Sequence, residues 1–130
     1  MFEQDYIMRQ IKEITAVIAK VLFGAKNVES SFYMLEEAER QKAFTLIEKM
    51  RSGQIKEAVD DVNRLADSNT KENLMIGLEF YSRLSNMEDG FFAEKGYSLV
   101  KARKAFEEFA EKYGLQQMTN LYFGDGNDDE

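Results

Sequence analysis

The chain contains no proline in 130 residues, and this absence constrains its fold more than any other single feature. Proline is the residue that breaks helices, so its absence favours long uninterrupted helices. The apolar residues are mostly Leu, Ile, Phe, Met and Ala, with few Val and Thr, which also argues against strands. We therefore expect an all-α fold, either an irregular bundle or a short solenoid, of about five long helices and one short helix.

Apolar residues recur at helical spacing along most of the chain. The expected helices cover residues 3–23, 31–51, 54–67, 70–85, 87–95 and 99–113. The expected caps are Asn27 or Ser30, Asn69, Asn86 and Ser98, and the expected stops are Gly24, Gly53, Gly96 and Gly114. Gly77 has no side chain and allows a neighbouring helix to approach closely. Residues 1–115 are expected to form a single helical domain, followed by a C-terminal arm and an acidic disordered tail at 116–130.

Histidine and cysteine are both absent, which excludes most catalytic and metal-binding motifs. A Ser-His-Asp triad, a Cys-His pair and a zinc HExxH motif are ruled out. The run EEAER, Glu36 to Arg40, offers carboxylates, but a di-metal bundle site pairs glutamate with histidine, so a solvated helix face is expected. The stretch DGNDD near the C-terminus does not complete a calcium loop. We expect no catalytic residue, no cofactor and no metal; an enzyme that uses carboxylates or lysine is the least favoured alternative.

The formal net charge of −7 makes nucleic acid an unfavourable partner. Glu3 and Asp5 stand where a signal peptide has basic residues, and no apolar run approaches the length that spans a membrane. The first helix has mixed rather than basic charge, which disfavours binding to a membrane surface. These features predict a cytoplasmic protein.

The first helix carries an isoleucine-rich stripe at heptad spacing. Its members are Ile7, Ile11, Ile14, Ile18 and Val21. The stripe has two interpretations: it is the core-facing side of a bundle helix, or it is a docking seam, for a copy of the chain in a homodimer or for another protein. The core interpretation is favoured, because few heptads are present.

Residues 80–109 are rich in aromatic side chains, which line a ligand pocket or fill the core. The candidate pocket residues are Tyr81, Phe92, Tyr97 and Phe106, with Arg83 or Lys101 as a polar contact. The expected caps and stops divide this stretch among three helices, so most rings are expected to fall on inward stripes. Phe91 and Phe92 are adjacent on a short helix, so one of them is expected to be partly exposed.

Two segments resemble a functionally uncharacterised family of short all-helical proteins from low-GC Gram-positive bacteria. The segments are DYIMRQIKEITAVIAKVLFG, residues 5–24, and EFYSRLSNMEDGFFAEKGYS, residues 79–98. The matching positions are Asp5, Tyr6, Ile7, Met8, Arg9, Phe80, Tyr81, Leu84, Asp89, Gly96, Tyr97, Ser98, Tyr113 and Gly114. The family tends to have acidic residues after the serine cap, whereas this chain reads SLVK. The resemblance implies a compact helical domain with tetratricopeptide-like hairpins and no catalytic motif.

These observations favour a non-enzymatic interaction or scaffold protein that acts through helix-face contacts, with the first helix as the expected contact surface. The alternative is a small-ligand-binding protein with a pocket between the aromatic helices.

Overall fold

The computed structural model describes residues 2–124, with the backbone alone described at 2–5 and 89. The disordered acidic tail that the sequence predicts therefore lies largely outside the described residues, at 125–130.

Eight α-helices and one short 3₁₀ helix account for the secondary structure of the described residues, so the predicted all-α fold is confirmed. The elements are α1 (Phe2–Phe23), α2 (Val28–Phe32), α3 (Glu37–Arg51), α4 (Ile55–Leu65), η1 (Ala66–Ser68), α5 (Lys71–Ser85), α6 (Asp89–Glu94), α7 (Leu99–Lys112) and α8 (Gln116–Phe123).

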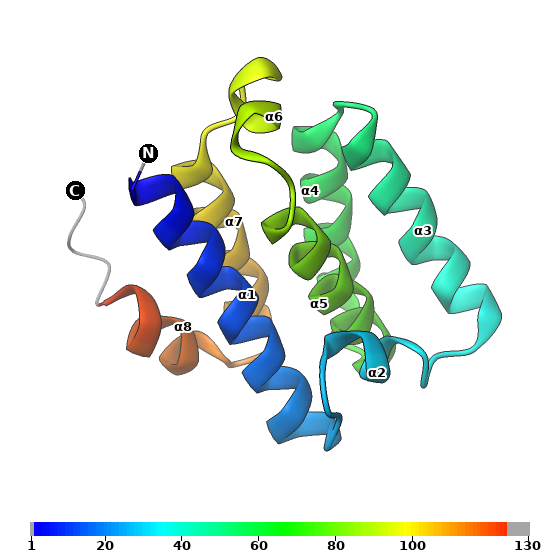
Figure 1. Ribbon diagram of the computed structural model, residues 1–130. Coiled ribbons are helices and arrows are strands. Elements are labelled where there is room, and N and C mark those ends of the chain that lie inside the picture. Colours follow the sequence, from blue (N-terminus) through cyan, green and yellow to red (C-terminus); the bar gives the residue numbers. More distant parts are fainter. Residues whose placement is uncertain (1, 125–130) are drawn as a thin grey trace.

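Helix α5 lies at the centre of the bundle, and ten of its 15 residues are buried. It packs against α1, α2, α3 and α4. Helix α7 packs against α1 and α4, and α3 and α8 lie on opposite sides of the bundle (Figure 1). Residues 74–81 of α5 are buried without interruption, so every side of the middle of this helix meets a neighbour.

The prediction of one helix over residues 31–51 is wrong, because the chain turns between α2 and α3. The side chain of Asn27 accepts a hydrogen bond from the amide of Ser30 and starts α2 early. Phe32 then packs edge-to-face on Phe44 of α3, with ring centroids 5.4 Å apart. Phe32 and Leu35 are both buried as a result. A tertiary contact within the core therefore favours the turn over the continuous helix.

Two of the predicted caps are confirmed and two are wrong. Asn27 and Ser98 cap α2 and α7 as expected. Thr70 caps α5, because Asn69 adopts the left-handed conformation with φ of 55° and only the hydroxyl of Thr70 reaches the amide of Asn73. Asn86 ends α5 rather than starting α6.

Helix α8 extends the packed body past the boundary expected at residue 115. It packs against α1 and α7. Phe123 is buried, and the amide of Gln10 donates a hydrogen bond to the carbonyl oxygen of Tyr122. The C-terminal arm is therefore ordered as far as Phe123.

Candidate functional site

The isoleucine stripe of α1 lies inside the monomer and does not form an open docking seam. Ile11, Ile14 and Ile18 have no exposed surface, and Ile7 is also buried. Val21 alone of the five faces solvent, with 63% of its surface exposed. The docking interpretation is thus corrected for the four isoleucines, because α1 packs this face against α5 and α7. The core interpretation, which the sequence favoured, accounts for them.

Three of the four rings of the candidate pocket fill the core instead of lining a hollow. Tyr81, Phe92 and Phe106 are buried. The rings of Tyr81 and Phe106 are in edge-to-face contact, with centroids 5.0 Å apart. The hydroxyl of Tyr81 donates to Oδ1 of Asn63 at 2.9 Å. The space between these aromatic helices is therefore occupied by the rings themselves.

Tyr97, the fourth predicted ring, does line a hollow, together with Lys101. The hollow has a volume of about 520 Å³ and lies where the α3–α4 turn meets the α6–α7 turn. Lys56 and Lys95 also line it, and Lys56 pairs with Asp60 at 2.9 Å. Burial, with a contribution from Asp60, raises the pKa of Tyr97 to about 12. The phenol is therefore neutral at neutral pH and available as a hydrogen-bond donor. Arg83, the other predicted polar contact, lines a different hollow.

The adjacent rings of α6 divide as the sequence predicts. Phe92 is 1% exposed, whereas Phe91 is only partly buried against the core. Their centroids are 5.8 Å apart in an edge-to-face contact.

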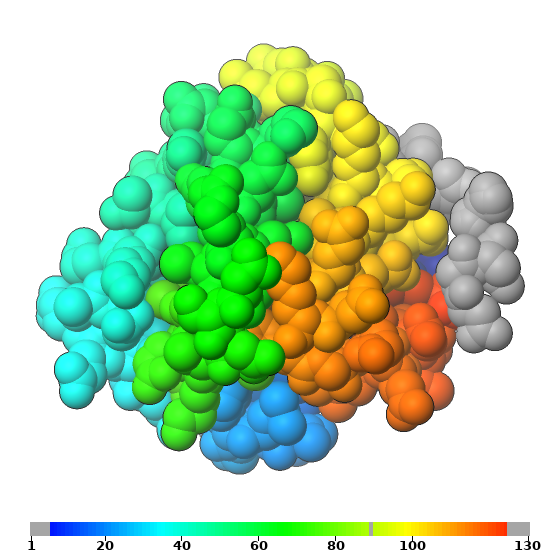
Figure 2. All heavy atoms as spheres, turned by 180° about the vertical axis from the view of Figure 1, so that it is seen from behind, coloured from blue at the N-terminus to red at the C-terminus, as the bar shows by residue number. Residues whose placement is uncertain are grey.

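A larger feature, which the sequence did not indicate, follows the side of α3 that faces α4 and the start of α5. Two hollows of about 600 and 450 Å³ lie there. Lys42 and Ser68 line both hollows, so the two lie next to each other, and together they are here called the α3 groove. It is lined by Met34, Leu35, Glu36, Glu39, Lys42, Thr45, Leu46, Asp61, Arg64, Leu65, Ser68, Thr70, Lys71, Glu72, Asn73 and Met75. Figure 2 shows α3, in cyan to blue-green, next to the green segment from α4 to the start of α5.

The α3 groove is lined by a few apolar side chains and by a larger number of charged and polar ones, here called its rim. Leu35, Leu46 and Met75 are buried, and their side chains supply the apolar part. Met34 at one end is 60% exposed, and the neighbouring Tyr33 is 54% exposed. These two side chains are adjacent on the turn before α3 and extend the apolar surface at this end of the groove; Val21 and Leu22, at the end of α1, are a second adjacent exposed pair.

Ion pairs hold the rim of the α3 groove in place. Asp61 accepts from Lys49 at 2.8 Å and from Arg64 at 2.7 Å, and these hydrogen bonds lower the pKa of its carboxyl group. Glu39 lies 3.5 Å from Lys42 on the next turn of α3. The guanidinium of Arg40 stacks over the ring of Tyr33, 5.5 Å from its centroid. Four charged residues of the rim, Glu39, Lys42, Asp61 and Arg64, are thus paired, whereas Glu36, Lys71 and Glu72 form no ion pair among the described residues.

The acidic run at the start of α3 forms ion pairs along its own helix, while Oε1 of Glu39 is buried without a hydrogen bond. Glu37 pairs with Arg40 at 3.5 Å, as Glu39 does with Lys42. Within the part of the chain that the structure describes, no group of three or more acidic side chains is arranged to hold a metal ion. Nor does any helix in residues 2–124 combine the length and apolar character needed to cross a membrane.

The structure thus defines the class of protein as an all-α bundle with charged hollows on its surface. The chain belongs to DUF6483, a family of unknown function whose model matches residues 1–114. No curated protein and no solved structure matches it. The match agrees with the expectation of a functionally uncharacterised family and covers both segments that carry the resemblance.

Proposed function

We propose that this protein is a non-enzymatic interaction protein that holds a segment of a protein partner in the α3 groove. The observation that carries the proposal is the groove itself: two adjacent hollows in which apolar side chains lie among charged and polar ones, next to the exposed Tyr33 and Met34. An apolar centre inside a polar rim is the usual anatomy of a protein interface, and aromatic side chains, Met and Arg are enriched there. The proposed contact surface is therefore on α3 and not on the first helix, which the sequence analysis favoured.

Several features favour a protein segment over other partners. The groove is open and extends along α3 from Glu36 to Leu46, as an extended or helical peptide requires. Its rim has charges of both signs, and the chain has a net charge of −7, which disfavours a polyanion. The partner should therefore present apolar side chains to Leu35, Leu46 and Met75 and polar groups to the rim.

Affinity capture with matched variants tests the proposal. Met34→Glu and Thr45→Arg change exposed side chains at the two ends of the groove, so neither should unfold the protein. The control is Val100→Glu, at an exposed apolar position on α7. A protein that is captured by the wild type and the control but lost by both groove variants supports the proposal. Equal capture by all four proteins overturns it.

A second copy of this chain is one candidate occupant of the groove. Sedimentation velocity over a range of concentrations tests it directly. Concentration-dependent dimerisation that Met34→Glu abolishes and Val100→Glu preserves identifies the partner as the chain itself.

The second candidate function is small-ligand binding at Tyr97, and it is favoured by the 520 Å³ hollow that Tyr97 and Lys101 line. Glu57 and Asp60 also line this hollow, and Asp60 pairs with Lys56, so the neutral phenol, Lys95 and Lys101 are the groups that suit an anionic ligand. A thermal-shift screen of anionic metabolites, with Tyr97→Phe and Lys101→Ala as variants, tests this function. Stabilisation that either variant removes supports it; no stabilisation by any compound counts against it.

Bacterial origin, a cytoplasmic location and the tetratricopeptide-like character of the helical hairpins are part of the proposal. The antiparallel pair α3 and α4, joined through Gly53, supports the last of these, because such hairpins present grooves to peptide partners.

A further inference from the structure

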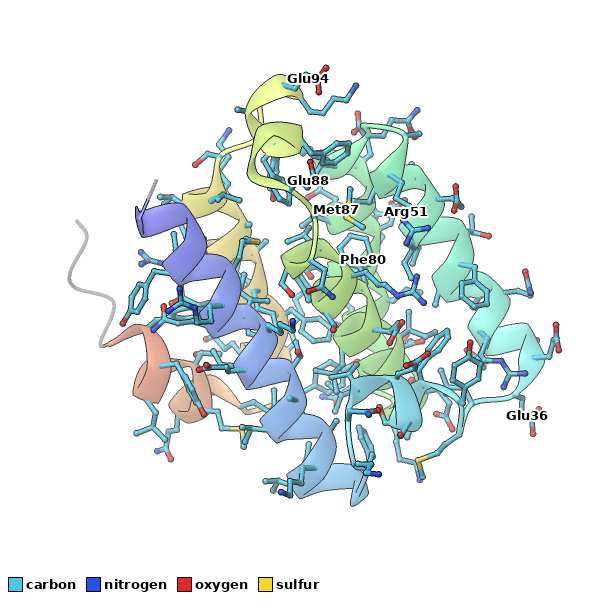
Figure 3. All side chains as sticks on the ribbon, viewed as in Figure 1. Glu36, Arg51, Phe80, Met87, Glu88 and Glu94 are labelled. Carbon is cyan, nitrogen blue, oxygen red and sulfur yellow. The ribbon has the colours of Figure 1, made fainter. Side chains whose placement is uncertain are left out.

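A polar cleft on a different part of the surface contains the one buried charged side chain among the described residues. Glu79, on α5, is 3% exposed. It lines a hollow of about 440 Å³ together with Glu29, Arg51, Ser82, Arg83, Asn86 and Met87. In Figure 3, Arg51 and Met87 lie on either side of the space between α3 and the end of α5. None of these residues lines the α3 groove or the hollow at Tyr97.

The buried carboxylate is only partly compensated by its surroundings. Oε2 of Glu79 accepts from Nε of Arg83 at 2.7 Å, one turn along the same helix. Burial raises the pKa of Glu79 from its ordinary value of 4.5, and Arg83 offsets part of that rise. Oε1 accepts no hydrogen bond from the residues that the structure describes. Because a buried carboxylate has about four acceptor positions, this side chain can accept further donors.

The cleft also contains hydrogen-bond donors whose capacity is only partly used by the described residues. Arg83 uses Nε for Glu79, and within the described chain its two terminal nitrogens form no hydrogen bond. Arg51 is held loosely by Glu48, with 3.5 Å between Nη1 and Oε2, and half of its side chain is exposed. The cleft thus places open guanidinium donors and an open carboxylate acceptor around one hollow.

The charged side chains that line the cleft restrict which ligands it can bind. Two carboxylates, Glu29 and Glu79, and two guanidinium groups, Arg51 and Arg83, line it. A simple anion meets the carboxylates and a simple cation meets the guanidinium groups, so each is repelled on one side. A small molecule that carries both an ammonium group and a carboxylate, close together, satisfies both. Pockets of a few hundred Å³ accommodate molecules of this size.

We propose that the cleft of Glu79, Arg51 and Arg83 binds a free α-amino acid or a related small zwitterion. The ammonium group donates to Oε1 of Glu79, and the carboxylate accepts from Arg51 and from the terminal nitrogens of Arg83. The hydroxyl of Ser82 and the amide of Asn86 lie at the same hollow and provide neutral hydrogen bonds. Binding would complete the hydrogen bonding of a carboxylate that folding has already removed from water.

The test is a thermal-shift screen of the purified full chain with the proteinogenic amino acids, followed by calorimetry on those that stabilise it. We expect at least one amino acid to raise the melting temperature by roughly 3 °C or more at saturation. The N-acetyl derivative, which lacks the ammonium group, and the amide, which lacks the carboxylate, should each lose at least about 90% of the affinity, or about tenfold.

Variants locate the site. Glu79→Gln and Arg51→Ala should each weaken binding at least about tenfold. Arg9→Ala and Glu37→Gln change exposed charged side chains that line none of the hollows and should leave the affinity unchanged. If Glu79→Gln does not fold, Arg51→Ala decides, because Arg51 is half exposed. The proposal is overturned if no amino acid stabilises the protein, if the blocked derivatives bind equally well, or if Arg51→Ala binds as the wild type does.

Discussion

The aromatic ring of Phe109 on α7 occupies the space that a side chain on Gly77 of α5 would need. A Cβ atom added to Gly77 would lie 2.1 Å from Cζ of Phe109, far inside van der Waals contact. Phe109 has no exposed surface, and its ring also contacts Tyr81 and Tyr113, with centroids 5.3 and 5.5 Å apart. The ring therefore has no free space to move into, and the packing of α7 on α5 depends on this glycine.

Gly77→Ala should destabilise the fold, although alanine usually favours helices. We expect the free energy of unfolding to fall by about 1–3 kcal/mol, because the added methyl group overpacks a closed core. Gly90→Ala is the matched control: nothing lies within 4 Å of its added Cβ, so it should be neutral or stabilising by about 0.5 kcal/mol. Urea unfolding measures both. Phe109→Leu should cost less in the Gly77→Ala background than alone; strict additivity would contradict the contact.

The isoleucine stripe of α1 gives a second prediction. Ile11→Glu with Ile18→Glu places two carboxylates in the core, at positions with no exposed surface. Each change should cost more than the about 2–5 kcal/mol of an isoleucine-to-alanine change, so the pair should unfold a domain of ordinary stability. Val21→Glu should stay folded, because Val21 faces solvent. Far-UV circular dichroism distinguishes the unfolded double variant from the folded Val21→Glu variant. A folded double variant that sediments as a smaller species would restore the docking interpretation.

Tyr81 and Tyr113 differ in whether the hydroxyl group forms a hydrogen bond within the described residues. The hydroxyl of Tyr81 donates to Asn63, whose amide in turn donates to the carbonyl of Ala105 at 2.9 Å and so links α5, α4 and α7. Tyr81→Phe should cost about 1–3 kcal/mol, since it leaves Oδ1 of Asn63 without its donor. The buried hydroxyl of Tyr113 finds no partner in residues 2–124, and burial raises its pKa to about 12. Tyr113→Phe should therefore be neutral or stabilising in the same unfolding assay; a loss as large as that of Tyr81→Phe would contradict this prediction.

The raised pKa of Glu79 predicts how stability depends on pH. Folding raises the pKa of this carboxyl group. As the pH rises, the folded protein therefore keeps the carboxyl proton after the unfolded chain has lost it. This contribution to stability is complete below about pH 4.5 and is lost as the pH rises through the folded pKa. The stability of the wild type relative to Glu79→Gln should therefore decrease as the pH rises above 4.5. Urea unfolding of both proteins from pH 4 to pH 7 measures it, at about half-unit steps. If the stability of the wild type relative to Glu79→Gln instead increased with pH, burial could not be the cause that dominates the pKa of Glu79.

Local signals explain why most helices could be predicted. Helices α1 and α7 begin and end within one or two residues of their predicted limits, because Gly24, Ser98 and Gly114 act on their own neighbourhoods. The break before α3 could not be predicted, since Phe32 and Leu35 continue the helical spacing and the turn depends on packing against Phe44. Local sequence does not specify which distant residue will contact a side chain.

The candidate sites were harder to predict for the same reason. The isoleucine stripe has one pattern whether α1 packs within the monomer or against a partner, so spacing alone left both interpretations open. Tyr97 and Lys101 were both identified as candidate pocket residues, and both line a hollow. The α3 groove depends on the α2–α3 turn, and Glu79 is one glutamate among many in sequence, distinguished only by its burial.

Site-specific photo-crosslinking in native cells tests the proposed role of the α3 groove most directly. A photoreactive phenylalanine analogue replaces Met34 or Thr45 at the groove, or Val100 on α7 as the control; all three positions are exposed. We predict that both groove positions crosslink to one and the same protein and that Val100 does not. Crosslinking from Val100 to that protein with equal yield, or none from either groove position, would contradict the account.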